Sequence, residues 1–335
     1  MLAAMYHGAG RIELVDLPRP DAGPGELVVR VRACGLCGSD LLDWYQDPRA
    51  PMVMGHEPVG VVADAGDGAR FAVGSRVFVH HHVPCMDCEL CRTGRETLCP
   101  TFRATRIDPG GLAEYIRVPA EIAGLDVLAL PDSVSDLAAT LVEPLGCVVR
   151  GQERADLVPG ATAVVIGAGA MGLLEIAAAR ARGVRVVAIE PRPERRALAR
   201  RCGAEAPEDI GIDAVQEIVG GDGAAAVFVT TSAPAAINAA ITLAGPGGLV
   251  QLFAPPRPGV PVPVDLGAAW FREVRIASTY SAGPADTRAA LALLQDGAVD
   301  PDLVISHRIP LAEIDHAFAL ARSPTAMKVV VDVSQ

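Results

Sequence analysis

Short apolar runs broken by glycine and proline dominate roughly the first 140 residues of the chain. Valine-rich runs lie at 27–32, 59–63 and 76–79, each between residues typical of turns. Runs of this length and composition predict short β-strands. This part of the chain is therefore expected to form an antiparallel, loop-rich β domain.

The pattern changes at about residue 161, where apolar strands begin to alternate with helices. Such alternation predicts a parallel, doubly wound sheet and an α/β fold class. The tail from about residue 282 is expected to carry a helix, a strand near Leu303, a second helix and a final apolar strand at 328–332. In the alternating region, strands are expected at 163–166, 184–189, 226–229 and 249–253, with a helix at 171–182.

Composition and charge narrow the class of protein. Half of the 335 residues are hydrophobic, which fits a globular chain long enough for two cores. The net charge of −11 argues against a surface that follows nucleic-acid phosphates. The sequence shows neither an uncharged apolar stretch of about 18 residues nor the pattern of a signal peptide. We therefore expect a cytoplasmic protein that spans no membrane and binds no nucleic acid.

A GxGxxG motif lies between an expected strand and an expected helix, and its glycines are Gly167, Gly169 and Gly172. In that setting Gly167 permits a tight turn, and Gly169 lets the backbone approach a pyrophosphate. Gly172 lets the helix pack closely on the strand. The helix N-terminus, beginning with Ala170 and Met171, supplies N–H donors to the phosphates. The motif predicts a dinucleotide-binding site.

An acidic residue ends the next strand, 18 residues after Gly172. The Glu190 carboxylate can accept hydrogen bonds from ribose hydroxyls and repel a 2′-phosphate, which favours NAD over NADP. Arg192, Arg195 and Arg196 lie in the same loop, and arginine is the usual partner of a 2′-phosphate. NAD is the expected cofactor, with Arg195 among the residues that contact it. NADP is the alternative if these arginines face the ribose and not the solvent.

Four of the eight cysteines lie within fifteen residues, in the spacing C-x2-C-x2-C-x7-C. In an intracellular protein such clustering indicates metal binding more than disulfides. Four thiolates complete the tetrahedral coordination of zinc and leave no open position, so a zinc ion held there is structural. The expected ligands are Cys85, Cys88, Cys91 and Cys99.

A more dispersed set combines Cys37, His56 and a carboxylate. Glu57 follows the histidine directly, and Glu143 comes much later in the chain. Three mixed ligands leave one coordination position open, which is the arrangement of a catalytic zinc. Asp40 is placed to hold the second nitrogen of the His56 imidazole.

Together these motifs resemble the zinc-containing medium-chain dehydrogenase/reductase superfamily, the alcohol dehydrogenases, and within it the sorbitol and threonine dehydrogenase-like branch. The zinc signature G-H-E-x2-G-x5-G-x2-A matches residues 55–69, and CGLCGSD at 34–40, the four-cysteine loop, Glu-Pro and the glycine-rich turn follow in the family's order. The resemblance covers essentially the whole chain. It implies a GroES-like β domain, residues 1–144 and 282–335, and a Rossmann doubly wound domain, residues 145–281.

The resemblance also implies roles for individual residues. Cys37, His56 and Glu57 would ligate a catalytic zinc, and Glu143 would be a fourth or exchanging ligand. The four cysteines of the loop would hold the second, structural zinc. The histidines at 80–82 match no ligand position of the family.

Ser39 would contact the substrate oxygen. Many relatives carry a histidine three residues after this serine, which passes the alcohol proton to solvent. Here that residue is Leu42, which cannot carry a proton. Asp43, a water chain from Ser39 or a cofactor ribose hydroxyl must take its place.

The implied activity is hydride transfer between NAD and a secondary alcohol or ketone of a polyol, sugar or cyclitol. The implied assembly is a homodimer or homotetramer that pairs through Rossmann-sheet edges near residues 249–266. One alternative is an NADPH-dependent biosynthetic carbonyl reductase of the same fold, which cofactor preference would distinguish. Another is a non-catalytic zinc scaffold or redox sensor, which would need only the four-cysteine loop.

Overall fold

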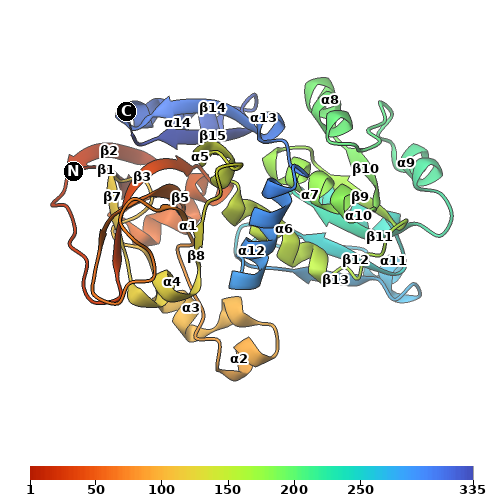
Figure 1. Ribbon diagram of the computed structural model, residues 1–335. Coiled ribbons are helices and arrows are strands. Elements are labelled where there is room, and N and C mark those ends of the chain that lie inside the picture. The colour runs from red at the N-terminus through yellow and green to blue at the C-terminus, as the bar shows by residue number, and fades with distance from the viewer. Residues whose placement is uncertain (335) are drawn as a thin grey trace. The chain divides into compact units, whose positions relative to one another are not determined.

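The computed structural model describes residues 1–334, and these divide into two compact units (Figure 1). The first unit comprises Met1–Gly146, Ser281–Gln295 and the chain from Ile305 onward, and the second comprises Cys147–Tyr280 and Asp296–Val304. The expected division placed the whole tail in the first domain. Residues 296–304 instead belong to the second unit, because helix α13 (Pro301–Val304) packs against helix α7 (Ala170–Ala181).

Two sheets of short strands form the framework of the first unit. The larger has the order β14-β15-β3-β5-β6-β8, with β7 beside β3, and the smaller has the order β2-β1-β4. All pairs are antiparallel except β14–β15, which is parallel. The strands are β1 (Leu2–Gly8), β2 (Arg11–Asp16), β3 (Leu27–Gly35), β4 (Met52–Val53), β5 (Glu57–Ala65), β6 (Arg76–Val79), β7 (Tyr115–Val118), β8 (Val127–Ala129), β14 (Ile305–Pro310) and β15 (Lys328–Asp332).

Apolar side chains from these strands build the core of the first unit. Val29 and Val31 of β3 lie in one buried cluster with Val331 of β15 and Phe318. The short helical elements are η1 (Gly38–Leu41), α1 (Asp43–Gln46), η2 (Asp47–Arg49), α2 (Glu89–Arg92), η3 (Glu96–Leu98), α3 (Pro100–Ala104), α4 (Ala120–Leu125), α5 (Asp136–Ala139) and η4 (Leu311–Glu313). The longer helices are α12 (Pro284–Gln295) and α14 (Ile314–Arg322), and α6 (Val142–Glu153) begins in this unit and continues into the second.

The second unit is built on a five-stranded, fully parallel sheet in the order β10-β9-β11-β12-β13. Beyond β10, a single parallel bridge joins Val187 to Glu205. The strands are β9 (Thr162–Ile166), β10 (Arg185–Ile189), β11 (Ala224–Val229), β12 (Ala244–Leu252) and β13 (Arg275–Ser278), and the helices besides α7 and α13 are α8 (Pro193–Arg201), α9 (Ile212–Val219), α10 (Pro234–Leu243) and α11 (Leu266–Trp270). This arrangement confirms the predicted doubly wound α/β fold. No helix within residues 1–334 is long and apolar enough to cross a membrane.

Candidate zinc and dinucleotide sites

The four cysteines of the 85–99 loop bring their sulfur atoms together. The Sγ atoms of Cys85 and Cys91 are 3.9 Å apart, those of Cys88 and Cys91 are 3.6 Å apart, and those of Cys85 and Cys99 are 3.5 Å apart. None of them is in a disulfide. Zinc–sulfur bonds of about 2.3 Å in a tetrahedron put neighbouring sulfurs about 3.8 Å apart. The measured separations bracket that value, so the donor set fits a closed tetrahedral zinc.

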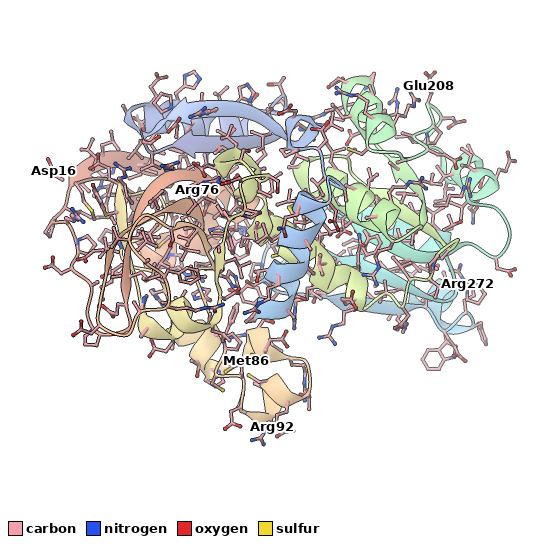
Figure 2. All side chains as sticks on the ribbon, in the orientation of Figure 1. Asp16, Arg76, Met86, Arg92, Glu208 and Arg272 are labelled. Atoms are coloured by element: carbon pink, nitrogen blue, oxygen red, sulfur yellow. The ribbon has the colours of Figure 1, made fainter. Side chains whose placement is uncertain are left out.

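Backbone N–H groups point at two of these sulfur atoms. The Cys85 N–H points at Cys99 Sγ at 3.5 Å, and the Cys88 N–H points at Cys85 Sγ at 3.4 Å. Backbone N–H groups of Asp87 and Cys88 lower the pKa of Cys85. Figure 2 shows Met86 on the projecting lobe that carries this loop, and the Met86 side chain is half-exposed. The lobe buries little apolar surface, so a metal cross-link is what would stabilise it.

Cys37, His56 and Glu57, here called the Cys37 set, lie together in the first unit. One ligand atom from each lies within 4.8 Å of the others. Asp40, which is 3% exposed, accepts a hydrogen bond from the Cys37 N–H at 3.0 Å with one oxygen. Its other oxygen lies 3.4 Å from His56 Nδ1. Asp40 therefore orients two of the expected ligands, as carboxylates behind metal-binding histidines do.

Burial and charge act in opposite directions on His56. Burial alone lowers its pKa, but the charges of Asp40 and Cys37 outweigh burial and raise the pKa well above its usual value. A divalent cation would replace the proton that this negative environment attracts. Both the negative charge around the Cys37 set and the types of its ligand atoms therefore fit a bound zinc.

Sequence reasoning missed the partner of Glu57. Lys328 is the only lysine of the chain, and its Nζ lies 2.6 Å from one Glu57 oxygen and 2.5 Å from the other. The pairing follows from strand order, because β15 pairs with β3 and β3 pairs with β5, where Glu57 is the first residue. Gly35 on β3 leaves the space, since a Cβ there would overlap the Glu57 carboxylate. Glu57 thus contacts the Lys328 ammonium and also belongs to the Cys37 set.

The other expected catalytic residues, Ser39 and Asp43, lie on two short helical elements that follow Cys37. Ser39 is half-buried in η1, and its carbonyl accepts a hydrogen bond from the Gln46 side chain at 2.9 Å. Asp43 begins α1 and forms an ion pair with Arg322 at 3.0 Å, with both side chains partly exposed. The Asp43 carboxylate is thus engaged by the Arg322 guanidinium. The geometry therefore favours Ser39 and water over Asp43 as the proton route.

Glu143 lies near the start of α6 and is 4% exposed. Burial raises the pKa of Glu57, and the charge of Glu143 adds to that rise, so the two carboxylates are neighbours. Ligand atoms of Glu143, His80 and His81 lie within 4.8 Å of one another. Sequence reasoning had given these histidines no metal role.

The glycine-rich turn joins β9 to α7 in the second unit. Gly167 has φ of +97°, and a Cβ at this position would lie 2.6 Å from Thr230 Oγ1. A Cβ on Gly172 would overlap the Gly167 carbonyl, so helix and turn need glycine at both places. At Gly169 the nearest atom is Arg195 Nη1, at 3.7 Å from such a Cβ, which leaves the backbone open to a pyrophosphate. Ala170 and Met171 form the first turn of α7.

Glu190 follows β10 and points back to this turn. It is 4% exposed, and its two oxygens accept hydrogen bonds from the backbone N–H groups of Ala168 at 2.8 Å and Arg192 at 3.0 Å. Arg196 is turned onto the carbonyls of Glu190 and Pro191. Burial and then the charge of Arg192 lower the pKa of Arg195, whose Nη1 lies 3.7 Å from the position of a Cβ on Gly169. The structure thus places Glu190 and Arg195 at the same turn.

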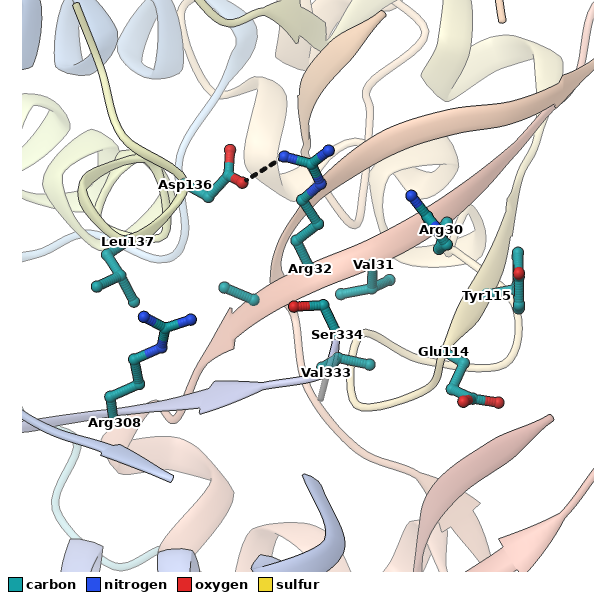
Figure 3. A pocket seen from close by; sticks show the side chains of 11 residues that line it. Arg30, Val31, Arg32, Glu114, Tyr115, Asp136, Leu137, Arg308, Val333 and Ser334 are labelled. Atoms are coloured by element: carbon teal, nitrogen blue, oxygen red, sulfur yellow. Dashed lines mark hydrogen bonds and ion pairs between the residues drawn. The ribbon is translucent and has the colours of Figure 1, made fainter. Parts of the chain in front are cut away.

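A separate pocket of about 520 Å³ lies in the first unit among residues of β3, β14 and α5 (Figure 3). Arg32 reaches Asp136 there at 3.1 Å, and Arg308 pairs with Asp332. Two of its three arginines are thus neutralised within the protein. None of the expected zinc or cofactor residues lines this pocket, and we assign it no part in the chemistry.

Each of the two units contains a segment that matches a known protein family. Residues 23–132 match the alcohol dehydrogenase GroES-like domain, and residues 170–296 match the zinc-binding dehydrogenase family. The sorbitol dehydrogenase of Bacillus subtilis (strain 168) is 30% identical over 99% of this chain and 97% of its own. The L-threonine 3-dehydrogenase of Idiomarina loihiensis is 30% identical over 97% of each chain.

Solved structures show the same fold over the full length. A structure described as a zinc-binding dehydrogenase from Sinorhizobium meliloti 1021, bound to NADP, superposes with a TM-score of 0.89. It is 29% identical, and the match covers 99% of each chain.

Proposed function

The chain belongs to the zinc-containing alcohol dehydrogenase family of medium-chain dehydrogenases, in the sorbitol and threonine dehydrogenase branch, and from this we propose hydride transfer between NAD and a secondary alcohol or ketone of a polyol, sugar or cyclitol. The chain is therefore an oxidoreductase. Sorbitol and threonine, for which the relatives are named, both carry secondary hydroxyl groups. The observation that carries the proposal is the Cys37 set, with Asp40 oriented behind two of its members.

Residues of the first unit would bind the metal, orient one of its ligands and move the substrate proton. Cys37, His56 and Glu57 would hold zinc, with Glu143 as an exchanging ligand, and zinc when bound supplies a Lewis acid that polarises the substrate oxygen. Asp40 keeps the His56 ring in one orientation through its contact with Nδ1. Ser39 accepts the proton of the substrate hydroxyl and passes it to water, because Asp43 is engaged by Arg322 and Leu42 carries no proton.

Glu190 supports NAD as the cofactor. Two backbone N–H groups hold its carboxylate at the glycine-rich turn, where it would accept hydrogen bonds from the adenosine ribose and repel a 2′-phosphate. NADP remains the second candidate, because Arg195 lies at the same turn and the Sinorhizobium meliloti structure is bound to NADP. A strong preference for NADPH would favour the biosynthetic reductase.

The experiment that tests the proposal is reduction of NAD and of NADP by the zinc-loaded protein across polyols, cyclitols and amino alcohols. We expect turnover with NAD on at least one secondary alcohol and much weaker turnover with NADP. No turnover with either cofactor on any of these compounds would reject the proposed activity and favour a zinc scaffold or redox sensor.

We propose that the protein assembles as a homodimer or homotetramer through the β13 edge of the parallel sheet. Trp270 and Phe271 next to this edge strand are 78% and 93% exposed. An unpaired edge flanked by large apolar side chains is suited to pairing with another copy. Sedimentation at micromolar concentration should show the oligomer, and Trp270→Glu should weaken it. A monomeric wild type would reject this mode of assembly.

A further inference from the structure

We propose that His80, His81 and Glu143 form a third metal site, here called the His80 site, which binds a divalent transition-metal ion of the zinc class beside the Cys37 set. The three residues offer two imidazole nitrogens and one carboxylate oxygen within 4.8 Å of one another. Two histidines and one glutamate are a known ligand set for zinc with one open position. Ligand atoms about 2.0–2.2 Å from zinc lie about 3.4 Å apart, so the side chains need move by only about 1 Å.

Two ring nitrogens of the His80 site lack a partner. His80 is completely buried, and its Nε2 has no hydrogen-bond partner within residues 1–334. His81 Nδ1 is likewise buried, with no hydrogen-bond partner in the described part of the chain. A buried polar atom left unpaired costs about 1–3 kcal/mol, so such atoms ordinarily mark a bound water or ion.

The surroundings of His80 select the form of the ring that binds metal. His80 Nδ1 lies 2.7 Å from Asp126, and the other Asp126 oxygen accepts a hydrogen bond from Thr287 Oγ1 at 2.6 Å. Because the carboxylate accepts, Nδ1 carries the proton and the lone pair of the neutral ring is at Nε2. A carboxylate behind one nitrogen of a histidine whose other nitrogen binds metal is a recurrent arrangement. Phe78 and Phe102 pack around the ring and fix its orientation.

Charge in this region also favours a further cation. The His56 and His81 ring centroids are 5.0 Å apart, so the His80 site adjoins the Cys37 set. Four carboxylates of this region are buried, which are Asp40, Glu57, Asp126 and Glu143, and Lys328 contacts one of them, Glu57. Glu143 belongs to the His80 site itself, and Asp126 contacts His80. A second divalent ion in the His80 site would offset their charge.

Metal content tests this proposal without reference to the activity. The protein as isolated is dialysed to equilibrium against excess Co²⁺, and the sum of bound cobalt and zinc is measured per chain. We expect three ions in the wild type and two in His80→Ala and His81→Ala. The third cobalt should add visible absorption without a thiolate-to-cobalt charge-transfer band, because the His80 site contains no sulfur. Retention of the other two ions in both variants shows that they are folded.

His82→Ala is the matched control, because His82 is the next histidine in the chain and its Nδ1 instead contacts the Thr105 carbonyl. It should keep three ions. Asp126→Asn should lower the affinity for the third ion about 10- to 100-fold, as loss of a carboxylate behind a histidine ligand typically does. Saturation of the wild type at two ions, as expected if water occupies the site, would overturn the proposal. So would a third ion that both histidine variants retain or that His82→Ala loses.

Discussion

Replacing Lys328 by methionine removes the cation that contacts both oxygens of the buried Glu57 carboxylate. Glu57 is 0% exposed and the Lys328 side chain 6%, and both Glu57 oxygens lie within 2.6 Å of the ammonium. Breaking a buried ion pair by removing one partner costs about 3–5 kcal/mol, because the other charge is left without compensation. For a unit of this size, about 2–4 °C of Tm corresponds to 1 kcal/mol, so Lys328→Met should lower Tm by about 6–20 °C.

The assay is calorimetric unfolding of the metal-free proteins, so that no zinc offsets the Glu57 charge, with two further variants. Glu57→Gln combined with Lys328→Met removes both charges and should recover part of the loss in Tm. Arg92→Met is the matched control, since Arg92 also lies 2.7 Å from a carboxylate, that of Asp87, but both side chains are more than two-thirds exposed. An exposed pair contributes at most about 1 kcal/mol. If Lys328→Met costs no more than Arg92→Met, or if the double variant recovers nothing, the buried pair does not stabilise the first unit.

Three further predictions concern the cofactor, a buried acid and the proton route. Glu190→Ala should weaken NAD binding and narrow the preference for NAD over NADP, measured by titration of both cofactors; an unchanged ratio would remove Glu190 from cofactor selection. Burial raises the pKa of Glu175 from its usual 4.5 to about 8. The folded carboxyl thus keeps a proton that the unfolded one has lost, so wild-type stability should fall between about pH 4.5 and 8, by up to about 5 kcal/mol at about 1.4 kcal/mol per pH unit. Glu175→Gln should flatten that pH dependence of Tm, whereas Gln substitution of the exposed Glu217 should leave it unchanged. Ser39→Ala should lower kcat on the order of 100-fold, as loss of a positioned proton-transfer group does, while Asp43→Asn should leave kcat and its pH profile unchanged. The reverse outcome would assign the relay to Asp43.

Features encoded locally could be predicted from the sequence. The glycine-rich turn, the strand before it and the helix after it are contiguous, so spacing and periodicity alone predicted β9 and α7 to within one residue. The four-cysteine loop is equally local, because its ligands span fifteen residues. Cys37, Asp40 and His56 could also be predicted, since they belong to one short stretch of chain that ends where strand β5 begins.

Contacts set by strand order could not be predicted in the same way. Lys328 and Glu57 are 271 residues apart, and they meet because β15 and β5 flank β3. Asp43 and Arg322 are separated by 279 residues, so nothing near Asp43 indicated that it would be paired. The approach of His80 and His81 to Glu143 depends on the same long-range packing. A lone lysine that opens an apolar strand was the one local sign that a buried partner had to exist.

The central claim, that Cys37 belongs to a catalytic zinc site distinct from a structural one, is tested most directly by zinc content and turnover of Cys37→Ser beside Cys91→Ser. Both are measured on the proteins as isolated, with wild type as reference. Cys37→Ser should lose one zinc per chain and all NAD reduction while its unfolding temperature stays close to that of the wild type. Cys91→Ser should instead lose the structural ion and much of its stability, because that zinc contributes folding free energy directly. Full zinc content and wild-type turnover in Cys37→Ser would contradict the claim.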